Sequence, residues 1–168
     1  MTVDDPRRDH FTPYRDRYTP VVCAGPKFLA SMFVSGPSND EERRKRRFAG
    51  HLLTLIQSRE LPYSRILTNN HVLDEAATRL KKKHSFEDAY DCVNTVRSSD
   101  SVEVRSLSQD TLDDAYETFV SFDDHGGAMT DFLNKAFVER TETPYVAVWD
   151  EHYEAFDDLR LLPNCDYA

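Results

Sequence analysis

Cysteine is scarce in this 168-residue chain, and its three cysteines are widely spaced, with no Cys-x-x-Cys pair among them. They are Cys23, Cys92 and Cys165. An odd number of cysteines at such spacing indicates neither a disulfide framework nor a zinc site. The histidines His71, His125 and His152 also lack metal-ligand spacing. The sequence therefore gives no sign of a metal centre built from thiols and imidazoles.

Long apolar runs are missing as well. No stretch approaches the roughly 18 apolar residues that a membrane span needs. The polar segment 1–17 has no apolar core of the kind that a signal peptide carries. The sequence also contains no internal repeat and no low-complexity segment. We therefore expect a cytoplasmic protein that does not enter a membrane.

Basic residues are fewer than acidic ones: 21 Lys and Arg stand against 30 Asp and Glu, which gives a net charge of −9. This balance favours solubility and argues against a globally basic nucleic-acid binder. The excess of Asp, with Arg commoner than Lys, is similar to the composition of halophile proteins. The length fits one α/β domain with its own core and is too short for two ordinary domains.

Short apolar runs alternate with segments of helical period. Strands are expected at 21–24, 66–67, 102–105, 146–148 and 159–162. Helices are expected at 27–33, 41–56, 72–80, 85–96 and 108–122, around Asp131, and as a short turn at 150–156. Strands joined through helices require right-handed crossovers. The sequence therefore predicts the α/β class, with a three-layer α/β/α, Rossmann-like fold around a central, mostly parallel sheet.

The ends of the chain are expected to lie outside this fold. Three prolines interrupt the charged segment 1–20, which is predicted to form an extended arm rather than part of the core. The domain is expected to span 21–163, and residues 164–168 form a C-terminal tail.

Three acidic residues stand near the ends of predicted strands. Glu75 lies near the start of a helix that follows a strand, Asp131 lies in the first turn of another helix, and Asp150 follows the apolar run 145–149. In a parallel sheet these positions share one edge. Carboxylates there suit Mg²⁺ or Mn²⁺ and phosphodiester cleavage. The alternative is that each acid only stabilises the start of a solvated helix through the macrodipole.

A basic run is the one strongly positive feature of this acidic chain. It consists of Arg43, Arg44, Lys45, Arg46 and Arg47. On a helix such a run is a solvated face, a phosphate-gripping edge or a docking site for an acidic partner. Thr68 and Thr130 stand beside the predicted acids, where they could hold a metal-bound water or a phosphate. The alternative is that they only cap helices.

Four short motifs occur in order along the chain. They are Thr68-Asn-Asn-His-Val-Leu-Asp-Glu75, Met129-Thr-Asp131-Phe, Val148-Trp-Asp150-Glu-His-Tyr-Glu-Ala-Phe156 and the closing Leu-Arg-Leu-Leu-Pro163. Through these motifs, the segment from about Val21 to Pro163 resembles a PIN domain. It is most similar to the VapC-like toxin ribonucleases of bacterial and archaeal toxin–antitoxin pairs.

The resemblance implies a PIN-like sheet domain in which four acids bind one or two Mg²⁺ or Mn²⁺ ions and activate water for attack on RNA. Glu75, Asp131 and Asp150 would be three of the four. The resemblance also implies a small antitoxin protein as partner and a homodimer. The chain departs from the family at the first strand, where Cys23 stands in place of an aspartate. A thiol is a poor ligand for Mg²⁺, so this change is expected to weaken metal binding.

Four explanations of Cys23 remain open. The position could be an engineered inactivation, a natural degeneration to a binding module, a site rescued by Asp123 or Asp124, or a site for a softer metal. Two main functions follow: a metal-dependent endoribonuclease toxin, or a PIN-like module that binds RNA or a protein through the basic run 43–47 without cleavage. A receiver-type signalling domain would need an acid pair after the first strand, which is absent there. A thiol enzyme using Cys23 is the remaining alternative.

Overall fold

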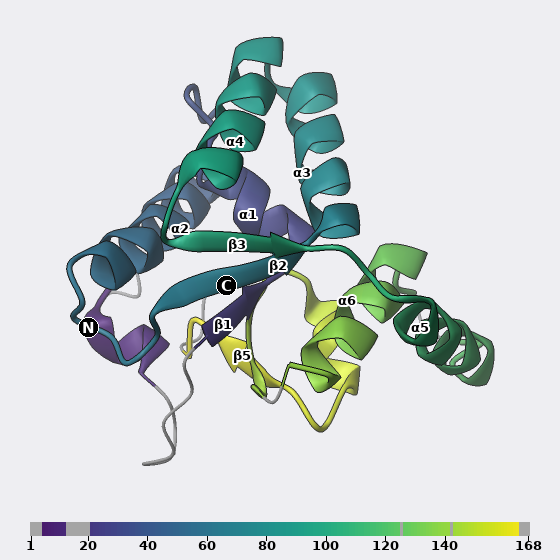
Figure 1. Cartoon of the computed structure of the whole chain (residues 1–168). Coiled ribbons are helices and arrows are strands. Elements are labelled where there is room, and N and C mark those ends of the chain that lie inside the picture. The colour runs from purple at the N-terminus through teal and green to yellow at the C-terminus, as the bar shows by residue number, and fades with distance from the viewer. Residues whose placement is uncertain (1–4, 13–20, 125, 142, 165–168) are drawn as a thin grey trace.

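The computed structural model describes residues 5–12, 21–124, 126–141 and 143–164, and its core is a five-stranded sheet (Figure 1). The strands are β1 Val21–Ala24, β2 Arg65–Asn69, β3 Val102–Arg105, β4 Tyr145–Ala147 and β5 Arg160–Leu162. They lie in the order β3-β2-β1-β4-β5, and each neighbouring pair is parallel. This confirms the predicted α/β class with a central parallel sheet.

Six α-helices and two 3₁₀ helices connect or flank the described strands. They are η1 Arg8–Phe11, α1 Pro26–Ser31, α2 Asp40–Gln57, α3 Asn70–Lys83, α4 Phe86–Ser98, α5 Gln109–Ser121, α6 Met129–Glu139 and η2 Glu151–Ala155. Side-chain caps begin four of the α-helices: Asn39 accepts from Glu42 N–H, and Asn69, Ser85 and Ser108 do the same for their own helices. Among these helices none is both long and apolar enough to cross a membrane.

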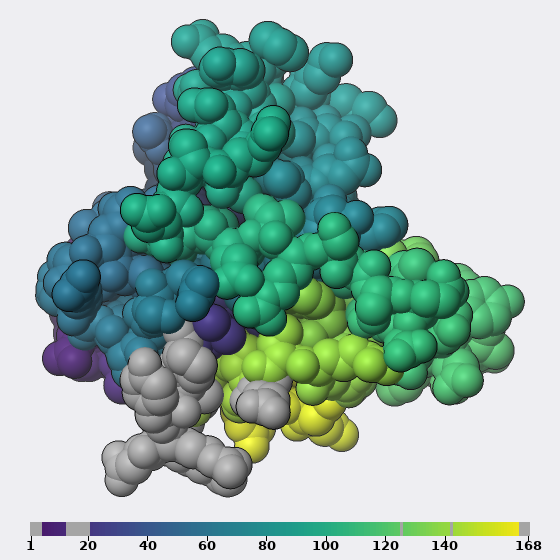
Figure 2. Space-filling view, in the orientation of Figure 1, coloured from purple at the N-terminus to yellow at the C-terminus, as the bar shows by residue number. Residues whose placement is uncertain are grey.

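The two faces of the sheet are covered by different helices. Val22 and Ala24 of β1 lie in a core cluster with apolar residues of α1 to α4, whereas Val21 and Cys23 lie in a second cluster with residues of α5, α6 and η2. This alternation follows from the period of two along a strand. All four residues of β1 are buried, as expected for a central strand covered on both faces. Figure 2 shows α3 with α4, and α5, as lobes that project from this body.

One boundary prediction was wrong. Residues 8–11 are not part of an arm outside the core, because they form η1 and bury Phe11 completely. The hydroxyl of Tyr63 donates a 3.0 Å hydrogen bond to the Phe11 carbonyl, and Asn164 N–H donates to the His10 carbonyl at 2.6 Å. The segment 5–12 therefore includes a piece of the domain. The other residues of the predicted arm, 1–4 and 13–20, and residues 165–168 of the tail lie outside the described residues.

The strand order places a switch point at the centre of the sheet. From β1 the chain builds outward through β2 and β3, and then returns to the other side of β1 to form β4 and β5. Gly25, directly after β1, donates a 2.8 Å hydrogen bond to the Ala147 carbonyl of β4. In open α/β sheets ligands bind at such a point, outside the carboxyl ends of the strands.

Candidate functional site

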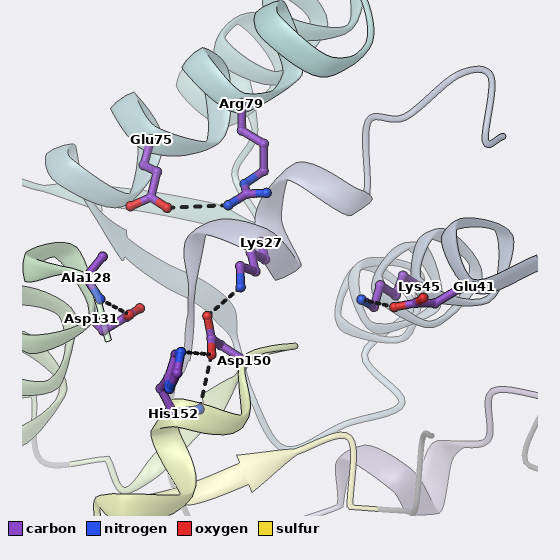
Figure 3. A network of polar contacts seen from close by, with 9 residues as sticks. All are labelled: Lys27, Glu41, Lys45, Glu75, Arg79, Ala128, Asp131, Asp150 and His152. Atoms are coloured by element: carbon purple, nitrogen blue, oxygen red, sulfur yellow. Dashed lines mark hydrogen bonds and ion pairs between the residues drawn. The ribbon is translucent and has the colours of Figure 1, made fainter. Parts of the chain in front are cut away.

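A cavity of ≈ 180 Å³ opens at this switch point, between the segments that follow β1 and β4. Its walls also include parts of α3, the start of α6, and η2. The three acids predicted from the sequence, Glu75, Asp131 and Asp150, all line it. Figure 3 shows them on three separate elements around one space.

Glu75 reaches the cavity from the second turn of α3. The helix begins there because Asn69, the last residue of β2, accepts a 3.0 Å hydrogen bond from Val72 N–H. Arg79, one turn further along, has its Nη2 atom 3.9 Å from Glu75 Oε1 and also lines the cavity. Among the described residues the buried Nε atom of Arg79 has no hydrogen-bond acceptor.

Asp131 lies in the first turn of α6, where its carboxylate accepts a 2.9 Å hydrogen bond from Ala128 N–H. The residue is only 5% exposed. Burial raises the pKa of Asp131, and the negative charges of Asp150 and Glu75 raise it further. The three carboxylates are therefore close enough to repel one another, as they would be in a site that receives a cation.

Asp150 follows β4 and caps η2 by accepting a 3.1 Å hydrogen bond from His152 N–H. Its other oxygen accepts a 2.6 Å hydrogen bond from the Lys27 ammonium group of α1. Burial opposes the ionisation of Asp150, but the bonds from Lys27 and His152 outweigh it and hold the pKa of Asp150 below its ordinary value. The imidazole of His152 lies 3.8 Å from the same carboxylate.

A buried chain of polar side chains connects the elements that carry these acids. Asn69 Nδ2 donates to Asn134 Oδ1 at 3.2 Å, and Asn134 Nδ2 donates to the Tyr153 hydroxyl at 3.1 Å. Tyr153 in turn lies close enough to Asp131 for the negative charge of that carboxylate to help raise the pKa of Tyr153. Asn69 and Asn134 are fully buried, and Tyr153 is nearly so. The chain therefore joins the start of α3, the middle of α6 and η2 behind the cavity.

The donor chemistry of the cavity fits Mg²⁺ or Mn²⁺, since its acidic groups are hard carboxylate oxygens that already repel one another. Glu75, Asp131 and Asp150 are the residues that would hold such an ion. They are not drawn together around one point: within the ranges given above, no three acidic, His or Cys side chains form a ready-made metal centre. Lys27 and Arg79 instead approach two of the three acids.

Cys23 does not occupy the position predicted for it. Its side chain is fully buried in the cluster of α5 and α6, with Sγ 3.7 Å from the hydroxyl of Thr141. The wall of the cavity is formed by the residues after the strand, beginning with Gly25. A side chain at Gly25 would meet Val148, because an added Cβ would lie 2.8 Å from Val148 Cγ1. The end of β1 therefore contributes neither a thiol nor an acid to the cavity.

The burial of two cysteines predicts their reactivity. Burial raises the pKa of Cys23 and of Cys92 to about 12, which leaves roughly one thousandth of the thiolate of an ordinary thiol at neutral pH. We expect iodoacetamide to leave both unmodified in the folded protein and to alkylate both in urea, as read by peptide mass mapping. Rapid alkylation of Cys23 in the folded protein would contradict this and revive its role as a nucleophile.

Thr68 is another residue whose predicted role does not match its position. It is fully buried in β2, and its hydroxyl has no hydrogen-bond partner in the described part of the chain. A direct contact with RNA is therefore not available to Thr68 in this conformation. Thr130 is half-buried in the first turn of α6, next to Asp131. Asp123 and Asp124 are exposed after α5 and are not in the cavity wall described above.

The basic run lies on the first half of α2 and borders a second, separate groove of ≈ 750 Å³. Several of its members already have partners. Arg43 pairs with Asp40, Lys45 with Glu41 at 2.5 Å, and Arg46 donates to the Ser35 carbonyl at 3.4 Å. Figure 3 shows the Lys45–Glu41 pair on its own helix, apart from Asp150. The structure therefore does not bring residues 43–47 into the acidic cavity.

The cavity also contains functional residues that are not acidic and that were not predicted from the sequence. Lys27 and Arg79 supply its positive charge, and His152 and Tyr153 form part of its wall. Two signals were available. Lys27 stands two residues after Gly25, where a strand turns into a helix, and Arg79 stands four residues after Glu75, on the same helical face.

Comparisons with known proteins agree with this architecture. No protein-family model matches the chain. No curated protein matches it either. Among solved structures, the toxin VapC20 of Mycobacterium tuberculosis, described as cleaving the sarcin-ricin loop, is similar with a TM-score of 0.66 and 20% sequence identity. The match covers 81% of this chain and 95% of the toxin. The chain therefore shares the fold of this toxin, a three-layer α/β/α, PIN-like fold, as its motifs predicted.

Proposed function

We propose that the chain is a PIN-domain endoribonuclease that hydrolyses RNA phosphodiesters at the cavity between β1 and β4. One observation carries the proposal: Glu75, Asp131 and Asp150 come from three separate elements and line one cavity at the switch point of a parallel sheet. The shared fold supports it, because the similar structure is that of an RNA-cleaving toxin.

The residues of the cavity have distinct tasks in this proposal. Bound Mg²⁺ or Mn²⁺ would supply Lewis acidity and an activated water. Glu75, Asp131 and Asp150 provide the negative charge that holds it. Arg79 presents a guanidinium group, whose planar set of donors matches phosphate oxygens. Its Nη2 atom lies 3.9 Å from Glu75 Oε1, too far for a hydrogen bond, so this end of the guanidinium group remains able to donate to an RNA phosphate.

The fold also supports a biological setting for this activity. The chain would be the toxin of a toxin–antitoxin pair, controlled by a small antitoxin protein, and would act in the cytoplasm. The sarcin-ricin loop, which VapC20 is described as cleaving, is the first RNA target to test. A homodimer is part of the same proposal. Large exposed apolar side chains on two helices offer surfaces for protein partners; they are Phe86 and Tyr90 on α4, and Tyr116, Phe119 and Val120 on α5.

Cleavage of labelled RNA tests the proposal. With Mn²⁺ or Mg²⁺ the unmodified protein is expected to cleave, and a chelator is expected to stop it. Glu75→Gln and Asp131→Asn each remove one negative charge from the cavity, so each is expected to slow cleavage roughly 100-fold. Glu117→Gln on the exposed face of α5 serves as the control and should cleave normally. Equal cleavage by all variants would mean that a contaminating nuclease is responsible.

A second function is favoured by the Lys27–Asp150 ion pair. Lys27 already neutralises Asp150, and the end of β1 contributes no acid to the cavity wall. A module that binds RNA or a protein without cleaving it could retain such an arrangement. The basic residues 43–47 of α2 would then carry the binding. This alternative predicts RNA affinity that falls as salt rises, since phosphate contacts release counterions, with no cleavage at any metal concentration.

A further inference from the structure

Lys27 is a charged residue of the cavity to which the proposed cleavage assigns no task. It is the second residue of α1, and its Nζ atom lies 2.6 Å from Asp150 Oδ2 (Figure 3). The two side chains differ in exposure: Lys27 is 40% exposed and Asp150 is 12% exposed. The ammonium group therefore enters from the open side of the cavity and covers one oxygen of a largely buried carboxylate.

The location of this lysine is electrostatically unfavourable without Asp150. The first turn of a helix carries the positive end of the backbone dipoles, so a cation there is disfavoured and an acid is preferred. The first turn of α1 contains no acid and contains Lys27. The ion pair with Asp150 compensates for this placement, which indicates that Lys27 is positioned for the cavity and not for the stability of its helix.

The chain leaves no other group in this position. Ala24 ends β1 inside the core, and Gly25 has no room for a side chain beside Val148. Pro26 then begins α1. Lys27 is therefore the first side chain after the central strand that can reach the acids, and it brings a positive charge.

The charges lining the cavity nearly cancel as a result. Among the described residues of its wall, three carboxylates face one ammonium and one guanidinium group, which leaves a single net negative charge. Arg79 contributes weakly, because it lies 3.9 Å from Glu75, whereas Lys27 makes a direct hydrogen bond. Of the two cations, Lys27 is thus the one that neutralises an acid.

We infer that the Lys27 ammonium group is the resident cation of the acidic cavity, and that a divalent metal ion gains Asp150 as a ligand only when Lys27 leaves it. The inference rests on the proposed use of Glu75, Asp131 and Asp150 as the acids of a nuclease site. It makes Lys27 a positioning residue that sets the concentration of divalent metal ion at which the site is occupied.

Direct Mn²⁺ binding tests the inference, measured without RNA by electron paramagnetic resonance of free Mn²⁺. Lys27→Met keeps an unbranched side chain that is one atom shorter and removes its charge. We expect this variant to bind Mn²⁺ about 10-fold more tightly than the unmodified protein, because it removes one competing positive charge at contact distance. Glu75→Gln added to Lys27→Met is expected to abolish the gain. Circular dichroism of each variant confirms that the fold is retained.

Arg65→Met is the matched control. Arg65 forms an ion pair of nearly the same length with Glu103, 2.7 Å, and is 46% exposed, but it lies at the start of β2, away from the cavity. It should bind Mn²⁺ as the unmodified protein does. If Lys27→Met gains no more affinity than Arg65→Met, whether the protein binds Mn²⁺ tightly or not at all, the inference is overturned. The RNA cleavage assay is read separately. If the protein does not cleave RNA but its Lys27→Met variant binds Mn²⁺ more tightly, the inference about Lys27 holds and only the proposed function fails.

Discussion

A Cys23→Asp variant is expected to lose a large part of its folding stability rather than to gain metal binding. Cys23 is fully buried between β1 and the helices α5 and α6, and Thr141 is the polar side chain near its sulfur. A carboxylate there would be an unpaired buried charge, which costs about 3–5 kcal/mol. Proteins of this size are stable by about 5–15 kcal/mol. Urea denaturation followed by circular dichroism measures the loss.

Cys23→Ala separates the charge from the loss of the thiol. It removes a small apolar group and is expected to cost about 1 kcal/mol. A Cys23→Asp protein with unchanged stability and tighter Mn²⁺ binding would show that the carboxylate reaches the cavity, contrary to the structure. The other result, a strongly destabilised protein, would end the hypothesis that Cys23 is a degenerate metal position.

The position of Cys23 away from the cavity, which the sequence did not indicate, has a simple physical origin. Successive side chains of a strand point to opposite faces, so a shift of one residue in the position assigned to a strand end exchanges the two faces. The apolar run 21–24 is buried on both faces and carries no alternation from which the faces could be assigned. The sequence therefore predicted the strand correctly and could not tell which of its residues approaches the cavity.

The acids were predictable because their positions depend on topology alone. Each of Glu75, Asp131 and Asp150 comes shortly after a strand or at a helix start, and a parallel sheet collects such positions at one edge. Lys27 was harder to assign, since the sequence does not show that Asp150, 123 residues away, meets its ammonium group. The burial of Phe11 was hidden by the prolines and charges around it, because its partner Tyr63 is also distant in the sequence.

The buried polar chain behind the cavity links stability to the geometry of the site. Asn69 begins α3 and thereby sets the position of Glu75, whereas Tyr153 contacts Asp131 and belongs to the turn that follows Asp150. Asn134 joins the two by donating to one and accepting from the other. Removing Asn134 is therefore expected to loosen the arrangement of all three acids.

Asn134→Leu, which keeps the approximate size of the side chain, is expected to lower the free energy of unfolding by about 2–4 kcal/mol. It leaves the Asn69 amide without its acceptor and the Tyr153 hydroxyl without its donor. Both side chains are fully or almost fully buried, and a buried polar group that loses its partner costs about 1–3 kcal/mol. The same change at the exposed Asn94 of α4 is the control, with an expected effect within about 0.5 kcal/mol.

A double-mutant cycle then decides whether the chain acts as a unit. Tyr153→Phe removes the hydroxyl that Asn134 bonds, so combining it with Asn134→Leu loses that bond only once. In urea denaturation, the destabilisation of the double variant should be smaller than the sum of the two single destabilisations by about 0.5–3 kcal/mol. Strict additivity would mean that the Asn134–Tyr153 bond contributes nothing. The three acids would then be held by their own helix starts and by Lys27, rather than by the buried polar chain behind them.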